Sequence, residues 1–437
     1  MLIFAHGIVG RADLPIPEAV FAAAAAGVLV VSFVALALLW SQPRLQHWPE
    51  RRLFRLPVAA DVVLGLFGVV VMAATAYAGL AGTEAERDNL APWMVYVALW
   101  VGIPCASLLV GDIWRLLSPW RAIGRGTGWL AASIGGKQLP APLVYPERLG
   151  RWPAAAGVIG FGICELCWAT AREPAPLAVL MLAYVVVMLV GMSLYGVAAW
   201  SSNADPFGVY FGFFAALAPL ARRDGVLVAR PPVLGAGLID GRVAGTVPVL
   251  LAGIGVTAFD GASEGPLFND LLPRLQDLFT GLGFGPARAL ELGFTVGLVA
   301  TVGLVALIWL LARPGRELAH SLAPILAAYV VAHYFSLLAY TGQDLARLAS
   351  DPLGDGSDLF GGAGASIEYG VVSATTIWYV QVAALVLGHV AALVLAHDRA
   401  LVRYGSHRAA TRSQLVMLML MVCFTCLGLW LLSAANG

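Results

Sequence analysis

Three ionisable residues of this sequence, Glu165, Asp260 and His333, occur within or at the end of long apolar stretches. An ionisable group at membrane depth is energetically expensive, and such groups usually mark functional sites. Carboxylates and imidazoles that meet at one depth suit a divalent cation such as Zn²⁺, Mn²⁺ or Mg²⁺, and a bound metal supplies hydroxide at neutral pH. We therefore predict a catalytic site formed by these three residues.

A divalent metal ion is the candidate cofactor of this site. Its predicted ligands are His6, Asp260 and His333. His6 precedes the first apolar block, and an N-terminal segment can fold back over the mouth of a helical bundle at little entropic cost. The alternative is structural, in that Glu165 and His333 would only hydrogen-bond neighbouring helices or each other.

Two cysteine pairs form a second pattern that could carry chemistry. Cys164 pairs with Cys167, and Cys423 with Cys426, at a spacing of three that puts each pair on one helix face. Four thiolates would make a soft site for Cu(I) or Zn²⁺, and facing pairs could also form disulfides. However, a CxxC within an apolar helix lacks the turn and the positive surroundings of a redox motif, and cysteine is a common core residue. We expect these pairs to be neither catalytic nor essential.

A third polar group, Gln381, His389, His397 and Asp398, lies along a later apolar stretch and at its exit. His389 and His397 are eight residues apart, close to one helix face after two turns, and together they could bind a second metal or a haem. Snorkelling or capping at a membrane interface is the competing role. The sequence contains no P-loop, Rossmann glycine pattern, GxSxG elbow or HExxH motif, so the enzyme classes that carry them are not supported.

The composition indicates that membrane-spanning helices position these residues. Of the 437 residues, 60% are apolar and 12% are charged, whereas about 25% of a soluble domain is charged. The mean hydropathy is +0.83. The apolar residues fall in blocks of about 20, the length that crosses a hydrocarbon core as a helix. With zero net charge and no basic patch, the lipid bilayer is the expected partner and nucleic acid is not.

The pattern predicts an all-α, polytopic transmembrane bundle of about ten spans, forming a single integral membrane domain over residues 1–437. The N-terminal segment lacks the basic region and cleavage site of a signal peptide, so the first block is expected to be a retained span. The predicted spans are Ile16–Trp40, Ala59–Ala81, Pro92–Val110, Trp152–Thr170, Ala175–Trp200, Val243–Ala258, Ala289–Leu311, Leu318–Thr341, Tyr369–Leu395 and Ser413–Ser433.

The basic residues predict the orientation of these spans. With ten spans the connections alternate sides, and 20 of the 26 Lys and Arg residues lie in connections that follow odd-numbered spans. The other six are Arg11, Arg87, Arg172, Arg274, Arg288 and Arg347. Because basic residues concentrate on the cytoplasmic side, we predict a multi-pass protein of the cell (plasma) membrane with both termini outside. Arginine replaces lysine except at Lys137, and alanine is frequent, which suggests a bacterial source.

Two connections contain apolar helices that are too short to span. Asp205 and Pro206 form a helix start before the aromatic run Phe207–Leu217, which we expect to lie along the inner interface. On the outer side, Asn269–Thr280 places leucines at helical spacing, and it is either a lid over an outward cavity or a helix packed on the bundle. Three spans contain a proline that is expected to bend the helix, namely Pro104, Pro248 and Pro324.

Several longer strings resemble a known group of proteins. They are His6-Gly7 with Gly10-Arg11-Ala12-Asp13-Leu14-Pro15-Ile16-Pro17, Phe259-Asp260-Gly261, Ala332-His333-Tyr334-Phe335, Ser350-Asp351-Pro352-Leu353-Gly354, Trp378-Tyr379-Val380-Gln381 and Ala396-His397-Asp398-Arg399. Together they are similar to bacterial, largely actinobacterial, membrane proteins labelled fenitrothion hydrolase. The resemblance implies membrane-associated hydrolysis of an organophosphate triester and a partner membrane subunit.

These observations leave three functions open. In the leading hypothesis the chain is a membrane-embedded hydrolase with an outward-facing, metal-assisted site, in which the metal polarises a phosphoryl oxygen and activates a bound water. In the second it is a transporter or a metal-handling protein, with Glu165, Gln381 and the cysteine pairs along its path. In the third it is a non-catalytic subunit of a membrane complex. Co-purified metal would separate the first two from the third, and turnover without transmembrane flux would separate the first from the second.

Overall fold

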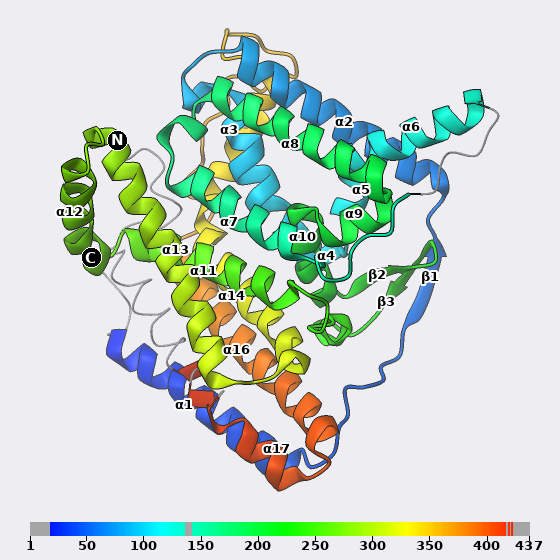
Figure 1. The fold of residues 1–437 in the computed structure, drawn as a ribbon, viewed down its shortest axis with the longest axis vertical. Coiled ribbons are helices and arrows are strands. Elements are labelled where there is room, and N and C mark those ends of the chain that lie inside the picture. The colour runs from blue at the N-terminus through cyan, green and yellow to red at the C-terminus, as the bar shows by residue number, and fades with distance from the viewer. Residues whose placement is uncertain (1–17, 136–141, 417, 420, 423–437) are drawn as a thin grey trace.

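The computed structural model describes residues 18–135, 142–416, 418, 419, 421 and 422. It is 74% helical and 3% strand, which confirms the prediction of a helical protein. In Figure 1 the long helices form one bundle, a small sheet lies at the right of the view, and α12 lies at the left.

Seven helical segments of the described chain are long and apolar enough to cross a membrane. Five are single helices: α2 (Val58–Ala81), α8 (Pro174–Tyr195), α11 (Thr246–Ser263), α13 (Pro286–Ala312) and α16 (Ala374–Tyr404). The other two are composite, namely Leu90–Val110 with α3 (Leu90–Pro92), the π-helix η2 (Trp93–Gly102) and α4 (Ile103–Val110), and Arg316–Ser350 with η5 (Arg316–Ser321), α14 (Leu322–Tyr340), η6 (Thr341–Gln343) and α15 (Asp344–Ser350). All seven overlap predicted spans, although α16 starts and ends later than the predicted Tyr369–Leu395.

Two more predicted spans correspond to shorter apolar helical stretches. These are Ala23–Leu39 within α1 (Glu18–Leu39) and the whole of α7 (Trp152–Leu166). Most of the last predicted span, Ser413–Ser433, lies outside the described residues, and the short helix α17 (His407–Ser413) precedes it.

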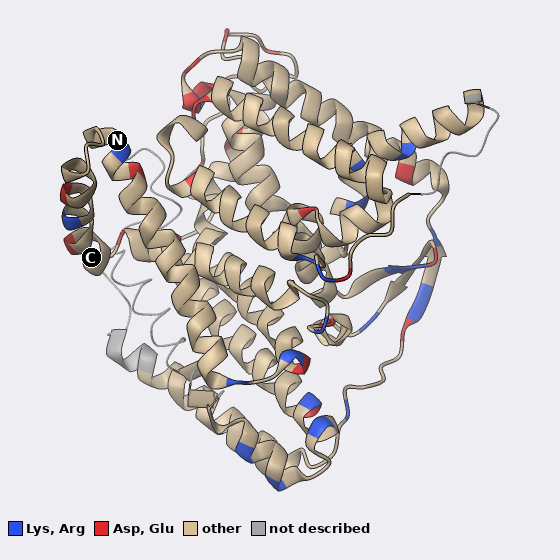
Figure 2. Cartoon of the chain, in the orientation of Figure 1, with Lys and Arg blue, Asp and Glu red and all other residues tan. Residues whose placement is uncertain are grey.

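The helices α11 and α14 form the centre of the bundle. In each of these two segments, 78% of the most apolar window is buried inside the protein, against 11% for α2 and 17% for α13. The middles of α2 and α13 carry no charged residues in Figure 2, and their exposed side chains are apolar, as expected for helices that face lipid. Polar groups on α11 and α14 are therefore shielded from lipid by the surrounding helices.

The helix α10 (Pro206–Leu217) has the predicted N-terminus, because the Asp205 side chain accepts a hydrogen bond from the Phe207 amide. Its predicted position along the interface is not what the structure shows, since most of its residues are buried inside the protein. Tyr210 stacks on Trp100 at 4.9 Å between ring centroids. A helix that is apolar on all sides is stable only when other helices surround it, which is the physical reason for the difference.

A three-stranded antiparallel sheet is the one part of the described fold that the all-α prediction missed. Its strands are β1 (Arg51–Arg55), β2 (Leu220–Arg223) and β3 (Val226–Ala229), in the order β1-β3-β2. Asp224 and Gly225 join β2 to β3 with positive φ angles of 51° and 79°, as in a two-residue hairpin turn. The sheet links the connection after the first predicted span to the connection after the fifth.

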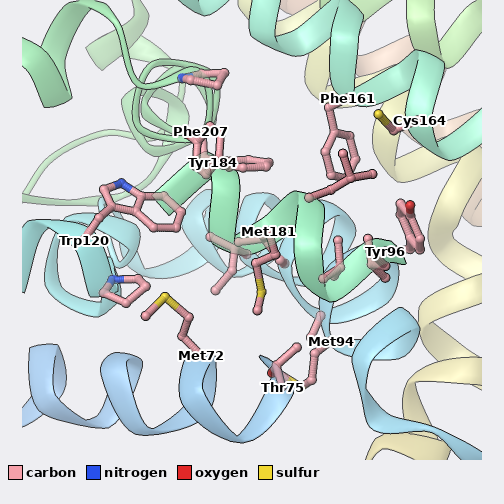
Figure 3. Close-up of a pocket in the computed structure, with 18 of the residues that line it drawn as sticks. Met72, Thr75, Met94, Tyr96, Trp120, Phe161, Cys164, Met181, Tyr184 and Phe207 are labelled. Atoms are coloured by element: carbon pink, nitrogen blue, oxygen red, sulfur yellow. The ribbon is translucent and has the colours of Figure 1, made fainter. Parts of the chain in front are cut away.

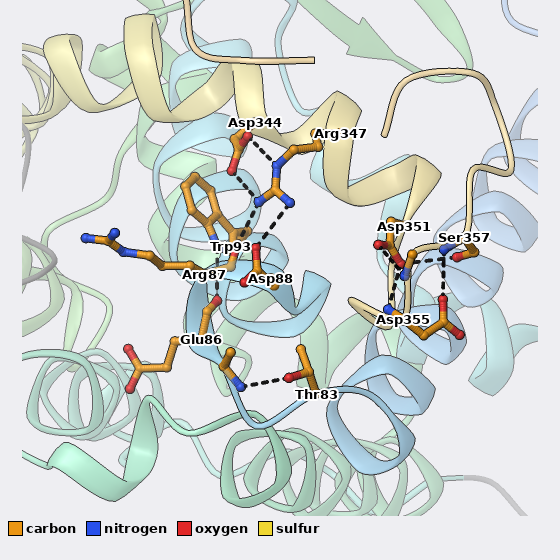
Figure 4. Close-up of polar contacts among 12 residues, drawn as sticks. Thr83, Glu86, Arg87, Asp88, Trp93, Asp344, Arg347, Asp351, Asp355 and Ser357 are labelled. Carbon is orange, nitrogen blue, oxygen red and sulfur yellow. Dashed lines mark hydrogen bonds and ion pairs between the residues drawn. The ribbon is translucent and has the colours of Figure 1, made fainter. Parts of the chain in front are cut away.

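On the predicted outer side, two connections far apart in sequence are tied together (Figure 4). The Arg347 guanidinium donates hydrogen bonds to both carboxylate oxygens of Asp344 at 2.8 Å and to the Arg87 carbonyl at 2.8 Å, and it pairs with Asp88 at 3.3 Å. Nearby, Asp351 accepts bonds from the amides of Asp355 and Gly356, which closes the loop that follows α15.

The second short helix that the sequence predicted, α12 (Pro266–Gly281), packs on α13. Its Phe268 side chain lies against Gly297 of α13 and forms an edge-to-face contact with Phe259 at 5.2 Å. Leu271 and Leu278 remain exposed. The packing role expected as the alternative to a lid is therefore the one observed.

Two of the three prolines expected to bend spans lie in the first turn of a helix. Pro248 and Pro324 are the third residues of α11 and α14, where the proline ring removes no intrahelical hydrogen bond. Pro104 is the second residue of α4, which follows the π-helical stretch of its span. The remaining described elements are α5 (Trp114–Leu117), α6 (Pro119–Gly135), α9 (Val197–Asn203), η1 (Glu86–Asp88), η3 (Ala169–Ala171) and η4 (Leu234–Leu238).

Candidate functional site between α7, α11 and α14

Asp260 of α11 and His333 of α14 form a buried pair in the centre of the bundle. The His333 Nε2 atom lies 2.9 Å from Asp260 Oδ2, and the neighbouring Tyr334 hydroxyl donates a hydrogen bond of 2.7 Å to the same oxygen. Asp260 is 2% exposed and His333 is 6% exposed. The predicted meeting of Asp260 with His333 is confirmed, and the catalytic and metal-binding roles of these residues stay predictions.

The second nitrogen of His333, Nδ1, lies beside Gly261. A carboxylate only accepts hydrogen bonds, so Nε2 donates to Asp260, and in the neutral imidazole Nδ1 then carries the lone pair. The ring makes no other hydrogen bond with the described part of the chain. A Cβ atom added at Gly261 would lie 3.7 Å from Nδ1, so the glycine borders this nitrogen.

Glu165 of α7 lies at the level of Asp260. The starts of α7 and α11 are joined by a hydrogen bond from the Arg151 amide to the Ala244 carbonyl, so the two helices run in the same direction. Farther along, a Cβ added at Gly162 would lie 2.8 Å from Val256. Glu165 follows Gly162 by three residues and Asp260 follows Val256 by four, so both carboxyl groups lie about one helical turn beyond this contact.

The Glu165 carboxyl group is buried and incompletely satisfied. The residue is 2% exposed, and its Oε2 atom has no hydrogen-bond partner. It interacts electrostatically with Asp260 but makes no direct bond to it in the described structure. The predicted three-residue site is therefore one bonded pair, Asp260 and His333, with Glu165 as a nearby third group.

Two residues that the sequence analysis did not select belong to the same site. Tyr334 hydrogen-bonds Asp260 directly, and its position next to His333 in the sequence was the available signal. Glu264 directly follows α11 and is half-buried. Burial raises the pKa of its carboxyl group, and the negative charge of Asp260 raises it further, whereas His333 lowers it. Glu264 therefore marks the end of the site that lies nearest to the outer connection.

The described residues contain no group of three or more His, Cys, Asp or Glu side chains that could hold a metal ion. Asp260 and His333 supply two of the three predicted ligands, and the third, His6, lies outside the described residues. A catalytic zinc commonly has three protein ligands. The donor set on the described helices is thus incomplete for the predicted metal.

The polar group on α16 divides into two parts. His389 is fully buried, its Nδ1 atom lies 2.8 Å from the Leu385 carbonyl of its own helix, and its Nε2 atom has no partner. The Gln381 side-chain nitrogen also lacks a partner. These two residues lie on one face of α16. Among the described residues, neither forms a hydrogen bond with Asp260 or His333.

His397 and Asp398 instead hold the chain that leaves α1. His397 Nε2 lies 3.0 Å from the Trp40 carbonyl, and Asp398 accepts hydrogen bonds from the Trp40 indole at 3.1 Å and from the side-chain amide of Gln46 at 2.6 Å. Capping at the end of α1 therefore describes His397, whereas a shared metal of His389 and His397 has no support in this geometry.

The first cysteine pair shares a helix end but not one environment. Cys164 lines an apolar cavity on one side of α7, and Cys167, at the C-terminus of the helix, is 4% exposed. Both are free thiols. Cys423 and Cys426 lie outside the described residues.

No protein-family model, curated protein or solved structure matches this chain. The main feature of the site is His333, which a buried carboxylate orients through one nitrogen and whose other nitrogen makes no hydrogen bond with the described residues.

Proposed function

We propose that this chain is a membrane-embedded hydrolase in which His333 is the general base and Asp260 is its positioning residue. The observation that carries the proposal is the 2.9 Å contact between His333 Nε2 and Asp260 Oδ2, which leaves Nδ1 as the ring atom for proton transfer. A histidine oriented by a carboxylate recurs in hydrolases on unrelated folds. In this arrangement Nδ1 takes a proton from the attacking water, and Asp260 stabilises the imidazolium that forms.

The substrate class follows from the resemblance to membrane proteins labelled fenitrothion hydrolase, and we propose an uncharged organophosphate triester. Water attacks the phosphorus atom, the bond to the aryloxy leaving group breaks, and His333 holds the proton that the water releases. A neutral substrate suits a site surrounded by apolar helices, because it pays no charge-desolvation penalty on entry.

We also propose a bound divalent metal ion, which can be tested separately from the role of His333 as a base. If bound by Asp260, His333 and His6, it would occupy the His333 lone pair and replace the imidazole as the group that activates water, by polarising the phosphoryl oxygen and lowering the pKa of a bound water. Elemental analysis of the purified protein tests this element. One equivalent of metal in the wild type that is lost in His333→Ala supports it, and full turnover in metal-free protein contradicts it.

The central experiment is turnover by the purified protein in lipid nanodiscs, measured as release of the nitrophenol from fenitrothion. General bases contribute about 10²- to 10⁴-fold to the rate, so His333→Ala should lower kcat by that order without lowering folded yield. The matched control is His389→Ala, which removes another buried histidine, bonded only to its own helix. Equal loss in both variants, or loss that tracks folded yield, would contradict the proposal.

A transporter is the second candidate, and the unpartnered Oε2 atom of Glu165 favours it. With Glu264 nearer the outer end and Asp260 at the level of Glu165, ionisable groups mark a path into the bundle. Glu165→Gln should then abolish proton or cation flux into proteoliposomes. A wild-type protein that hydrolyses substrate without flux excludes this candidate, and flux without turnover favours it over the hydrolase. Turnover only in native membranes would indicate the partner membrane subunit.

We also propose ten spans with both termini outside, in the plasma membrane of a bacterium. Contacts between connections of like parity support this orientation. The sheet joins the first and fifth connections, Arg403 pairs with Glu317 at 3.1 Å across the ninth and seventh, and Arg347 pairs with Asp88 across the eighth and second. Reporter fusions after residue 437 and within β1 should report opposite sides, and reports from the same side would contradict the topology.

A further inference from the structure

A cavity of about 600 Å³ lies on the side of α7 opposite the Asp260 site. Figure 3 shows its walls, with Met72 and Thr75 from α2, Tyr96 from η2, Met181 from α8, and Phe161 from α7. Most of these elements belong to membrane-spanning segments. The cavity therefore lies among the helices and not in a connection.

The lining is apolar, and no charged residue contributes to it. Two of its polar side chains are engaged with backbone carbonyls. The Thr75 hydroxyl donates to the Val71 carbonyl, and the Tyr96 hydroxyl donates to the Ala171 carbonyl.

Tyr184 and Trp120 both donate hydrogen bonds of 2.8 Å to the buried carboxylate of Asp205. Trp114, which also lines the cavity, has a buried indole nitrogen without a partner. A water cluster needs two to four polar partners for each molecule, and this lining cannot supply them. A charged or strongly polar ligand would be equally unsatisfied.

The cavity reaches exposed side chains of two apolar helices. Phe67 of α2 is 58% exposed and Leu180 of α8 is 40% exposed, and both line the cavity. Both belong to helices of high hydropathy whose outward surfaces are apolar. Hydrocarbon from the bilayer can thus reach the cavity sideways, without crossing a polar surface.

We propose that this cavity binds an acyl chain of a membrane phospholipid, which enters between α2 and α8. A void that stays empty destabilises the protein in proportion to its volume, and water gains too few hydrogen bonds to fill this one. An acyl chain matches the apolar walls and is the most abundant apolar group at the mouth. The inference is independent of the proposed hydrolase, because none of the Asp260, His333 or Glu165 side chains lines the cavity.

Two glycines offer a matched test. Gly160 lines the cavity, and a Cβ added there would meet no atom within 4 Å. Gly303 of α13 is exposed, and a Cβ added there would also meet no atom within 4 Å. Gly160→Leu therefore introduces a side chain into the cavity without a backbone clash, and Gly303→Leu makes the same change on the lipid-facing surface.

The experiment uses the full chain in phosphatidylcholine vesicles that contain a phosphatidylcholine with a diazirine on its acyl chain. After illumination, mass spectrometry locates the adducts. In the wild type and in Gly303→Leu, we expect adducts on Met72, Met181 and Cys164, and in Gly160→Leu these should fall severalfold. Unchanged labelling of these residues in Gly160→Leu would overturn the proposal. Wild-type adducts confined to outward-facing residues such as Val186 and Val187 would overturn it as well, even if the variant failed to fold.

Discussion

The two faces of α7 border regions of opposite character. Gly160, Phe161 and Cys164 line the apolar cavity, while Gly162 and Glu165 face α11 and the Asp260 site. Each region has a buried aspartate near it. Asp205 accepts hydrogen bonds from Trp120, Tyr184 and a helix N-terminal amide, whereas Asp260 accepts bonds from His333 and Tyr334.

The hydrogen-bond partners of the two buried aspartates explain why we assign a structural role to Asp205 and a functional role to Asp260. The partners of Asp205 do not titrate near neutral pH, and one of them is the backbone, so the carboxylate serves as a fixed helix cap. A partner of Asp260 is an imidazole, the side chain that changes charge near neutral pH. The difference lies in the donors and not in the burial, since both aspartates are less than 3% exposed.

The largest expected effect is that of Asp260→Asn, which breaks the functional side of the comparison. The amide cannot orient His333 as a carboxylate does or stabilise its imidazolium, so kcat should fall by about 10²-fold or more with little change in KM. The measurement is steady-state turnover in nanodiscs, with folded yield determined in parallel. A fall in yield of the same size as the fall in kcat would mean that Asp260, too, is only structural.

The next effect should appear in stability alone. Asp205→Ala removes the helix cap and leaves buried Trp120 and Tyr184 donors unpaired, which should cost about 3 kcal/mol of unfolding free energy. Turnover per folded molecule should not change. The control is Asp240→Ala, because this side chain is 45% exposed and bonded to its neighbour Arg242. Equal stability of the two variants in denaturant titrations would contradict the structural role.

A smaller effect should separate the two faces of α7 directly. A side chain at Gly162 would press on Val256 at 2.8 Å, so Gly162→Leu should destabilise the protein by about 1–3 kcal/mol. Gly160→Leu, two residues away on the cavity face, should leave stability unchanged or raise it, because glycine is a poor helix former. Thermal unfolding in the same detergent compares them. Similar losses in both would show that the cavity face is as closely packed as the other.

The smallest effect is expected for the cysteines. Cys164→Ala removes a thiol from the wall of the apolar cavity, and Cys167→Ala removes one from the core. Neither thiol belongs to a group of three metal-ligating side chains among the described residues. Turnover should stay within about twofold of wild type, because replacing cysteine by alanine changes the side-chain volume little and so costs little stability. Loss of a bound copper or of activity in the double variant would instead restore the soft-metal hypothesis.

Much of the fold could be predicted from the sequence, because its signals are local. A block of about 20 apolar residues specifies a spanning helix whatever surrounds it, and seven such segments appear in the structure. The high energetic cost of an ionisable group in lipid likewise selected Glu165, Asp260 and His333. The sheet was missed although Asp224-Gly225 is a strong hairpin signal, because β1 pairs with a strand far away in the sequence.

Hydropathy and charge by themselves determined that this protein is a helical membrane protein, and where its costly polar groups lie. Only the tertiary structure decided which of those groups meet. Asp260 and His333 are 73 residues apart, and their contact depends on the packing of α11 against α14, which no local pattern encodes. The same packing buried α10, tied Asp398 to the connection after α1, and left Glu165 beside the pair instead of within it. Composition sets the energy of burying a group, whereas long-range packing sets its partners.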